Sequence, residues 1–141
     1  MQTDVDNIIA TIEDIESVEE VDDLQKLEDA VDQLFKSSHP ERGVDALLRL
    51  FERFPESDGY GLFRTILHGL ERLPDYEHKV IESVQRKPAR FNVLMVNRMI
   101  NAGVPTVGNT DLLALLRAVA TNPESNEAVR EDVRGFLEWQ D

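Results

Sequence analysis

Apolar side chains recur at intervals of three and four residues along nearly the whole chain. In the first segment this spacing places Val5, Ile8, Ile12 and Ile15 on one stripe of a helix, and later segments repeat the pattern. No segment shows the strict alternation of apolar and polar residues that is typical of a strand. The sequence therefore predicts an all-α fold of about eight helices.

Proline, glycine and short polar runs divide the 141 residues into these helices. Ser17 and Ser38 each stand three residues before a glutamate, which fits the capping box at a helix start. Residues 103–109 have the composition of a loop, and Asn109 or Thr110 is expected to cap the helix that follows.

Helix pairs recur at a loose spacing, over residues 38–72, 73–103 and 105–140. This period lies in the range of helical repeats, although no residue-level repeat signature accompanies it. We expect a single all-α domain over residues 1–141 with its helices in antiparallel pairs, arranged as a HEAT-like α-solenoid or as a compact α-bundle. Residues 1–36 would form an acidic helical hairpin and residues 38–141 a helical-repeat-like body.

The charge of the chain is concentrated near its start. The net charge is −13, and residues 1–35 hold 12 acids and one base, Lys26. Binding of phosphates needs clustered Lys and Arg, so we expect no direct contact with nucleic acid. There is no cysteine, no apolar stretch long enough to span a membrane and no signal-peptide pattern at Met1. These features predict a soluble cytoplasmic protein that does not act at a membrane.

The acidic hairpin is the first candidate binding surface. Its acids can simply be a solvated face that keeps the protein soluble. Like charges one turn apart on a helix nevertheless cost a few tenths of a kcal/mol per pair, and this hairpin has few bases to compensate. A basic partner, steered by the charge, accounts better for such a face. The candidate partner-binding acids are Glu13, Glu16, Glu19, Glu20, Asp22 and Asp23.

A second candidate lies at Asp58–Gly61, where two glycines flank Tyr60 at a helix entry. Asp58 can cap the helix, and the glycines allow a close approach of backbones. The element is either a tight corner between helices or a corner that contacts a partner. Tyr60 and Trp139 are the aromatic side chains that we expect to anchor a tight complex.

The three histidines are the candidates for metal and acid–base chemistry. His39 stands at a helix start, His78 has the pattern of a surface residue, and His68 precedes Glu71 by three residues. A zinc enzyme needs three protein ligands and an open position, and no second histidine has the required spacing to His68. We therefore expect no metal, no cofactor and no enzymatic activity. A metal-dependent enzyme centred on His68 is the less favoured alternative.

Four stretches of the sequence have a familiar pattern, namely residues 51–55, 58–63, 67–71 and 91–103. Together they resemble small all-α bacterial immunity proteins, which are encoded beside polymorphic or contact-dependent growth-inhibition toxins. The resemblance covers roughly residues 40–140, so the acidic hairpin lies outside it. It implies a cytoplasmic protein that binds one toxin domain, often a nuclease with a basic cleft, and blocks its active site. We expect a monomer or weak dimer when free. A helical-repeat scaffold without a toxin partner remains the alternative.

Overall fold

The computed structural model describes residues 2–140, and its fold is all-α, as predicted. The α-helices in this part of the chain are α1 (Gln2–Glu13), α2 (Val21–Lys36), α3 (Val44–Arg53), α4 (Leu62–Glu71), α5 (Tyr76–Arg86), α6 (Arg90–Asn101), α7 (Leu112–Thr121) and α8 (Glu127–Gln140). Two short 3₁₀ turns, η1 (Pro40–Gly43) and η2 (Gly59–Gly61), precede α3 and α4. Strands β1 (Thr106–Val107) and β2 (Thr110–Asp111) form a small antiparallel hairpin.

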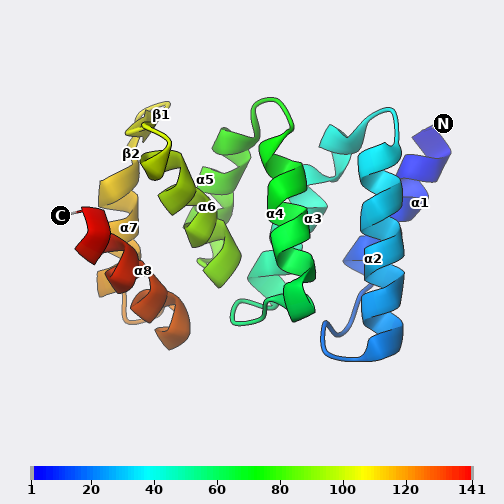
Figure 1. Ribbon diagram of the computed structural model, residues 1–141, viewed down its shortest axis with the longest axis horizontal. Helices are drawn as coiled ribbons and strands as arrows, with labels where there is room; N and C mark the ends of the chain where they lie inside the picture. Colours follow the sequence, from blue (N-terminus) through cyan, green and yellow to red (C-terminus); the bar gives the residue numbers. More distant parts are fainter. Residues whose placement is uncertain (1, 141) are drawn as a thin grey trace.

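The helices follow one another in chain order along the longest axis of the molecule (Figure 1). Consecutive helices pack as the pairs α1–α2, α3–α4, α5–α6 and α7–α8. Further contacts join α3 to α5 and α6, and α6 to α4, α7 and α8, so that neighbouring pairs share one core. None of the helices in the described residues has the length and apolar character needed to cross a membrane.

Three phenylalanines lie at the centre of this core, where α3, α4 and α6 meet. Phe51 and Phe63 are fully buried, and Phe91 is nearly so. The ring centroids of Phe51 lie 5.0 Å from Phe63 and 5.6 Å from Phe91. Phe63 meets Phe91 edge to face at 5.7 Å. Aromatic pairs favour such tilted arrangements because of their quadrupoles. The cluster fixes the start of α4, and with it the loop that carries Tyr60.

Several predicted helix starts are wrong in detail. The Ser17 hydroxyl accepts the N–H groups of Glu19 and Glu20, but α2 begins only at Val21, so the serine closes a loop turn rather than capping the helix. Asp111, not Asn109 or Thr110, caps α7, since its Oδ1 accepts the N–H of Ala114 at 3.0 Å. The loop predicted over residues 103–109 also contains β1, whose pairing with β2 the sequence pattern did not indicate.

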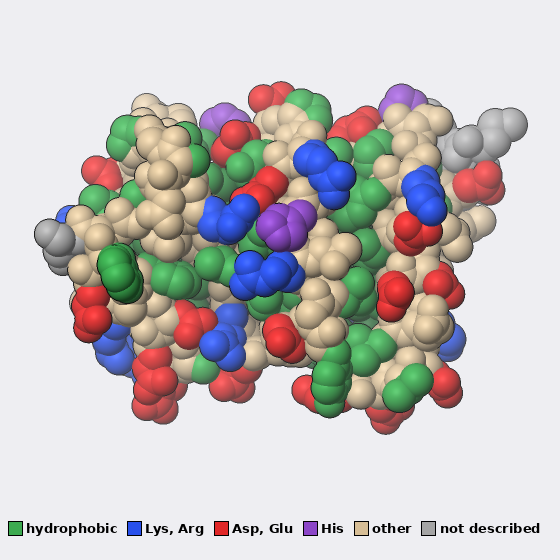
Figure 2. Space-filling view, viewed as in Figure 1, with side chains coloured by type: hydrophobic (Ala, Val, Ile, Leu, Met, Phe, Trp, Pro, Cys, Tyr) green, Lys and Arg blue, Asp and Glu red, His purple; other side chains and the backbone are tan. Residues whose placement is uncertain are grey.

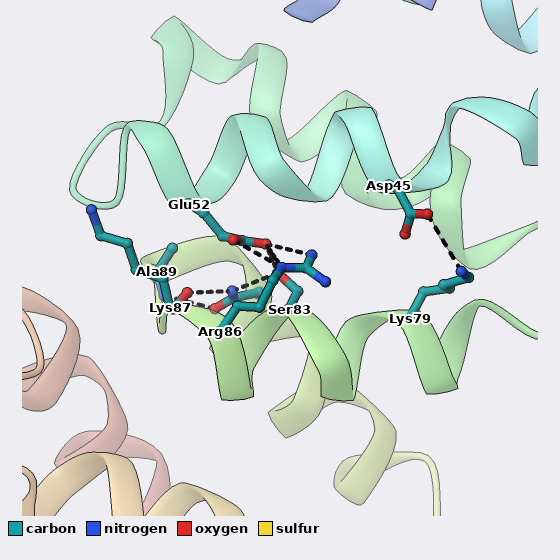
Figure 3. A network of polar contacts seen from close by, with 8 residues as sticks. Asp45, Glu52, Lys79, Ser83, Arg86, Lys87 and Ala89 are labelled. Atoms are coloured by element: carbon teal, nitrogen blue, oxygen red, sulfur yellow. Dashed lines mark hydrogen bonds and ion pairs between the residues drawn. The ribbon is translucent and has the colours of Figure 1, made fainter.

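A buried polar network joins α3, α5 and α6 (Figure 3). Glu52 on α3 accepts a hydrogen bond from the Ser83 hydroxyl at 2.8 Å and from Arg86 Nη2 at 2.7 Å. Asn92 on α6 donates to the Ser83 hydroxyl at 2.9 Å and accepts the N–H of Ala89 at 2.7 Å. Each buried polar side chain of this network thus has partners, as burial requires. Hydrogen bonding to Glu52 raises the pKa of Arg86 above its ordinary value.

Two helical glycines should respond in opposite ways to alanine. A Cβ at Gly69 on α4 would clash with the ring of Phe35 on α2, whereas nothing lies within 4 Å of one at Gly135 on α8. We expect Gly69→Ala to lower the free energy of unfolding by about 1–3 kcal/mol through overpacking. Gly135→Ala should raise it by about 0.5–1 kcal/mol through helix propensity. Urea unfolding followed by circular dichroism measures both, and equal effects would contradict this account.

Candidate functional site

Two loops that are far apart in the sequence meet along one edge of the helical array, the lower edge in Figure 1. The α1–α2 loop and the α3–α4 loop together line one groove, which contains Glu16, Glu19 and Glu56. Arg53, the last residue of α3, joins them, because its guanidinium donates to the backbone carbonyls of Ile12, Glu13 and Ile15 at 2.8–3.0 Å. Burial lowers the pKa of Arg53, and the nearby carboxylates of Glu13 and Asp14 oppose that shift. We call residues 13–23 and 54–61 the acidic end.

The structure places all the predicted acids on the acidic end. Glu13, Glu16, Glu19, Glu20 and Asp22 are exposed, and Asp23 is partly exposed. Asp58 is exposed as well and shares a cleft of about 640 Å³ with Glu19, which comes from the other loop. The two candidate surfaces predicted from the sequence, the acidic hairpin and the Asp58 corner, are therefore adjacent.

The Tyr60 corner has an unusual backbone. Gly59, Tyr60 and Gly61 have φ angles of +57°, +53° and +91°, so three successive residues adopt the left-handed region. For a residue with a Cβ this conformation costs of order 1–2 kcal/mol. Asp58 holds the turn, since its Oδ1 accepts the N–H of Tyr60 at 3.0 Å and its carbonyl accepts the N–H of Phe63 at 3.1 Å.

Tyr60 nevertheless gains little burial from this strained position. Its side chain is 73% exposed, and it lines a shallow groove with Leu24 and Glu28 of α2. Val21, one turn before Leu24 on the same helix face, is 80% exposed. In Figure 2 the lower edge, below α2 and α4, carries hydrophobic side chains surrounded by acidic ones. Apolar groups fixed within a charged rim are typical of protein-binding surfaces.

The sequence pattern did not predict two further residues of the acidic end, Glu56 and Val21. Glu56 is exposed and lines both the cleft and the groove, and Val21 adds apolar surface. Neither stands in a motif, so only the meeting of the two loops identifies them. Trp139, the other predicted anchor, is 91% exposed but lies on the last turn of α8, the last helix of the array, whereas Tyr60 lies between α3 and α4 (Figure 1). The structure therefore does not bring Trp139 and Tyr60 together.

The histidines are dispersed over the surface. His68 and Glu71 do face each other, with His68 Nδ1 3.8 Å from Glu71 Oε1. The Glu71 carboxylate also accepts two hydrogen bonds from Arg98, at 2.7 and 2.9 Å. His39 Nδ1 lies 3.2 Å from Glu41 Oε1. Among the described residues there is no group of three or more His, Cys, Asp or Glu that could hold a metal ion.

The acidic end thus combines exposed carboxylates, a fixed tyrosine and a cleft. Carboxylates attract the Lys and Arg side chains of a partner and accelerate its encounter. Exposed tyrosines supply a large contact area with few rotatable bonds to immobilise. Comparison with protein-family models, curated proteins and solved structures finds no match to the chain.

Proposed function

We propose that this protein is a non-enzymatic, cytoplasmic inhibitor that binds a bacterial toxin domain through the acidic end and occludes a basic active-site cleft. The observation that carries the proposal is the fixed, exposed Tyr60 within a rim of carboxylates from two loops. The resemblance of residues 40–140 to immunity proteins supplies the class of partner. A nuclease-like toxin would present the positive cleft that such a surface complements.

The charge of the acidic end supports a role in association. Nine acids lie within it, namely Glu13, Asp14, Glu16, Glu19, Glu20, Asp22, Asp23, Glu56 and Asp58. Neither range contains a base, and Arg53, which directly precedes the second range, is held by backbone carbonyls. The field of this end is therefore strongly negative, which raises the association rate with a basic surface and makes that rate depend on salt.

The rigidity of the Tyr60 corner supports a role in affinity. The turn is fixed by the bonds to Asp58, and a Cβ at Gly59 would crowd the buried ring of Phe63, so the loop has little room to rearrange. An anchor that is already in place loses less entropy when it binds. The strained backbone is explained if contact with a partner is what Tyr60 provides.

The proposal is tested by co-expression with the product of the gene immediately upstream. We expect that product to arrest growth when it is expressed alone and this protein to restore growth. A variant in which Glu16, Glu19, Glu20 and Asp22 are all replaced by Lys should associate with the purified toxin domain at least about tenfold more slowly in stopped-flow measurements at low salt.

The matched control replaces Glu82, Glu124, Glu131 and Glu138 by Lys. These exposed acids lie on α5, on α8 and before α8, and the control has the same net charge of −5 as the test variant, eight units above −13. It should associate at close to the wild-type rate. Equal slowing of both variants would remove the acidic end from the interface. Growth that is neither arrested nor restored would contradict inhibition of the upstream product.

A further inference from the structure

Arginine and histidine side chains follow the outer face of α4 at one-turn intervals. Arg64, His68 and Arg72 are four residues apart, which places them along one side of the helix over about 12 Å. All three are exposed. Arg98 of α6 joins them, and Figure 2 shows basic and histidine side chains gathered over α4 and α6 in the middle of this face. We call Arg64, His68, Arg72 and Arg98 the basic stripe.

The stripe is short of acidic partners, although the chain has 28 acids for 15 bases. Among the described residues, Glu71 is the one carboxylate that forms ion pairs within the stripe, with Arg98 and His68. Arg72 donates only to the backbone carbonyl of His68, at 3.3 Å, and no carboxylate of the described residues lies within 4.0 Å of Arg64. Three guanidinium groups thus face one carboxylate.

We propose that the basic stripe docks an acidic helix of a protein partner. Guanidinium groups bind carboxylates through paired hydrogen bonds. Basic side chains at one-turn spacing along α4 match carboxylates at the same spacing on a helix that lies beside it. Like charges at this spacing weaken an isolated helix, and an acidic partner would reverse that effect. This surface lies on the face of α4 and α6 and borders the acidic end at Arg64, which lines the cleft that also holds Glu19 and Asp58. The inference does not depend on toxin inhibition.

An acidic protein segment suits the stripe better than nucleic acid does. The stripe offers three arginines and a histidine, while the whole chain carries −13, most of it in residues 1–35. A polyphosphate chain would extend beyond the stripe and meet this negative field, whereas affinity for it depends on neutralising many phosphates. A short acidic helix places its few charges on the stripe alone.

The test uses a capped peptide of an alanine–glutamine helix that carries three Glu residues four apart, and a matched peptide with Gln at those positions. In ¹H–¹⁵N spectra of the labelled protein at 20 mM salt, the Glu peptide should shift the Nε–H signals of Arg64, Arg72 and Arg98. The Gln peptide should not. The double variant Arg64→Gln/Arg72→Gln should bind the Glu peptide about fivefold more weakly, since exposed ion pairs are individually weak.

The control variant Arg49→Gln/Lys87→Gln removes two other exposed cations, from α3 and from the loop after α5, with the same change in charge. It should bind the Glu peptide as the wild type does. The proposal would be overturned if the control variant lost as much affinity for the Glu peptide as the double variant does. It would also be overturned if the Glu peptide shifted signals over the whole surface or shifted none. Equal or tighter binding of an oligothymidylate with the same number of negative charges would overturn it as well, because the stripe would then recognise phosphate.

Discussion

Replacing Glu52 with alanine should lower the free energy of unfolding by about 1–3 kcal/mol, the range for leaving a buried hydrogen-bonding group without its partner. The Glu52 side chain is only 10% exposed and bonds both Ser83 and Arg86 of α5. Its removal leaves the Arg86 guanidinium and the Ser83 hydroxyl without the acceptor that they bind in the native state. Since Asn92 also bonds Ser83, the disturbance reaches α6. Chemical denaturation followed by circular dichroism measures the loss.

A second ion pair between the same two helices provides the control. Asp45 and Lys79 also join α3 to α5 but are 54% and 46% exposed, at an N–O distance of 3.4 Å (Figure 3). Asp45→Ala should cost less than about 1 kcal/mol, because solvent screens such pairs. Comparable losses in Asp45→Ala and Glu52→Ala would show that burial does not set the strength of the network.

A double variant separates the net contribution of the Glu52–Arg86 pair to stability from the destabilisation caused by removing only one partner. Buried ion pairs replaced by apolar residues of similar volume often leave stability unchanged or raised. Glu52→Leu/Arg86→Met should therefore recover most of the stability that Glu52→Ala loses. We expect this recovery if Glu52→Ala loses stability because Arg86 and Ser83 are left without a hydrogen-bond acceptor. If the lost attraction between Glu52 and Arg86 were the cause, the double variant would be as unstable as Glu52→Ala.

Helical spacing was enough to predict the fold class but not where each helix begins. The spacing of Val5, Ile8, Ile12 and Ile15 reflects burial on one face, which is a local property of sequence. A helix start depends on competing turns, and Ser17 fits a capping box while its hydroxyl closes the preceding loop. The hairpin at Thr106–Asp111 consists of two residues per strand, too few to show a period of two.

The individual acids of the candidate site could be predicted from the sequence. That the two loops carrying them lie side by side could not. Asp58 and Glu19 share a cleft because Arg53 reaches carbonyls 38–41 residues away, and no local pattern encodes that contact. For the basic stripe, too, the individual residues were predictable and their surroundings were not. The spacing of Arg64 and Arg72 can be read from the sequence, but the lack of carboxylate partners for them among residues 2–140 depends on how the helices pack.

Replacing Tyr60 with glycine should weaken binding of the partner at least about thirtyfold, since aromatic hot spots contribute 2 kcal/mol or more. The free energy of unfolding should stay within about 1 kcal/mol of the wild-type value. Glycine relieves the left-handed backbone at φ +53°, and its greater freedom in the unfolded chain offsets that gain. Calorimetry with the toxin domain and thermal unfolding of the free protein measure the two quantities.

Kinetics distinguish the tyrosine from the acids around it. Exposed charges act mainly before contact, so reversal of the acids should slow association. Tyr60 acts once the surfaces have met, so Tyr60→Gly should mainly accelerate dissociation. Tyr60→Phe keeps the ring, and it should retain most of the affinity if apolar contact is what binds. An unchanged dissociation rate in Tyr60→Gly would contradict an anchoring role, and the strained corner would then be only a turn between α3 and α4.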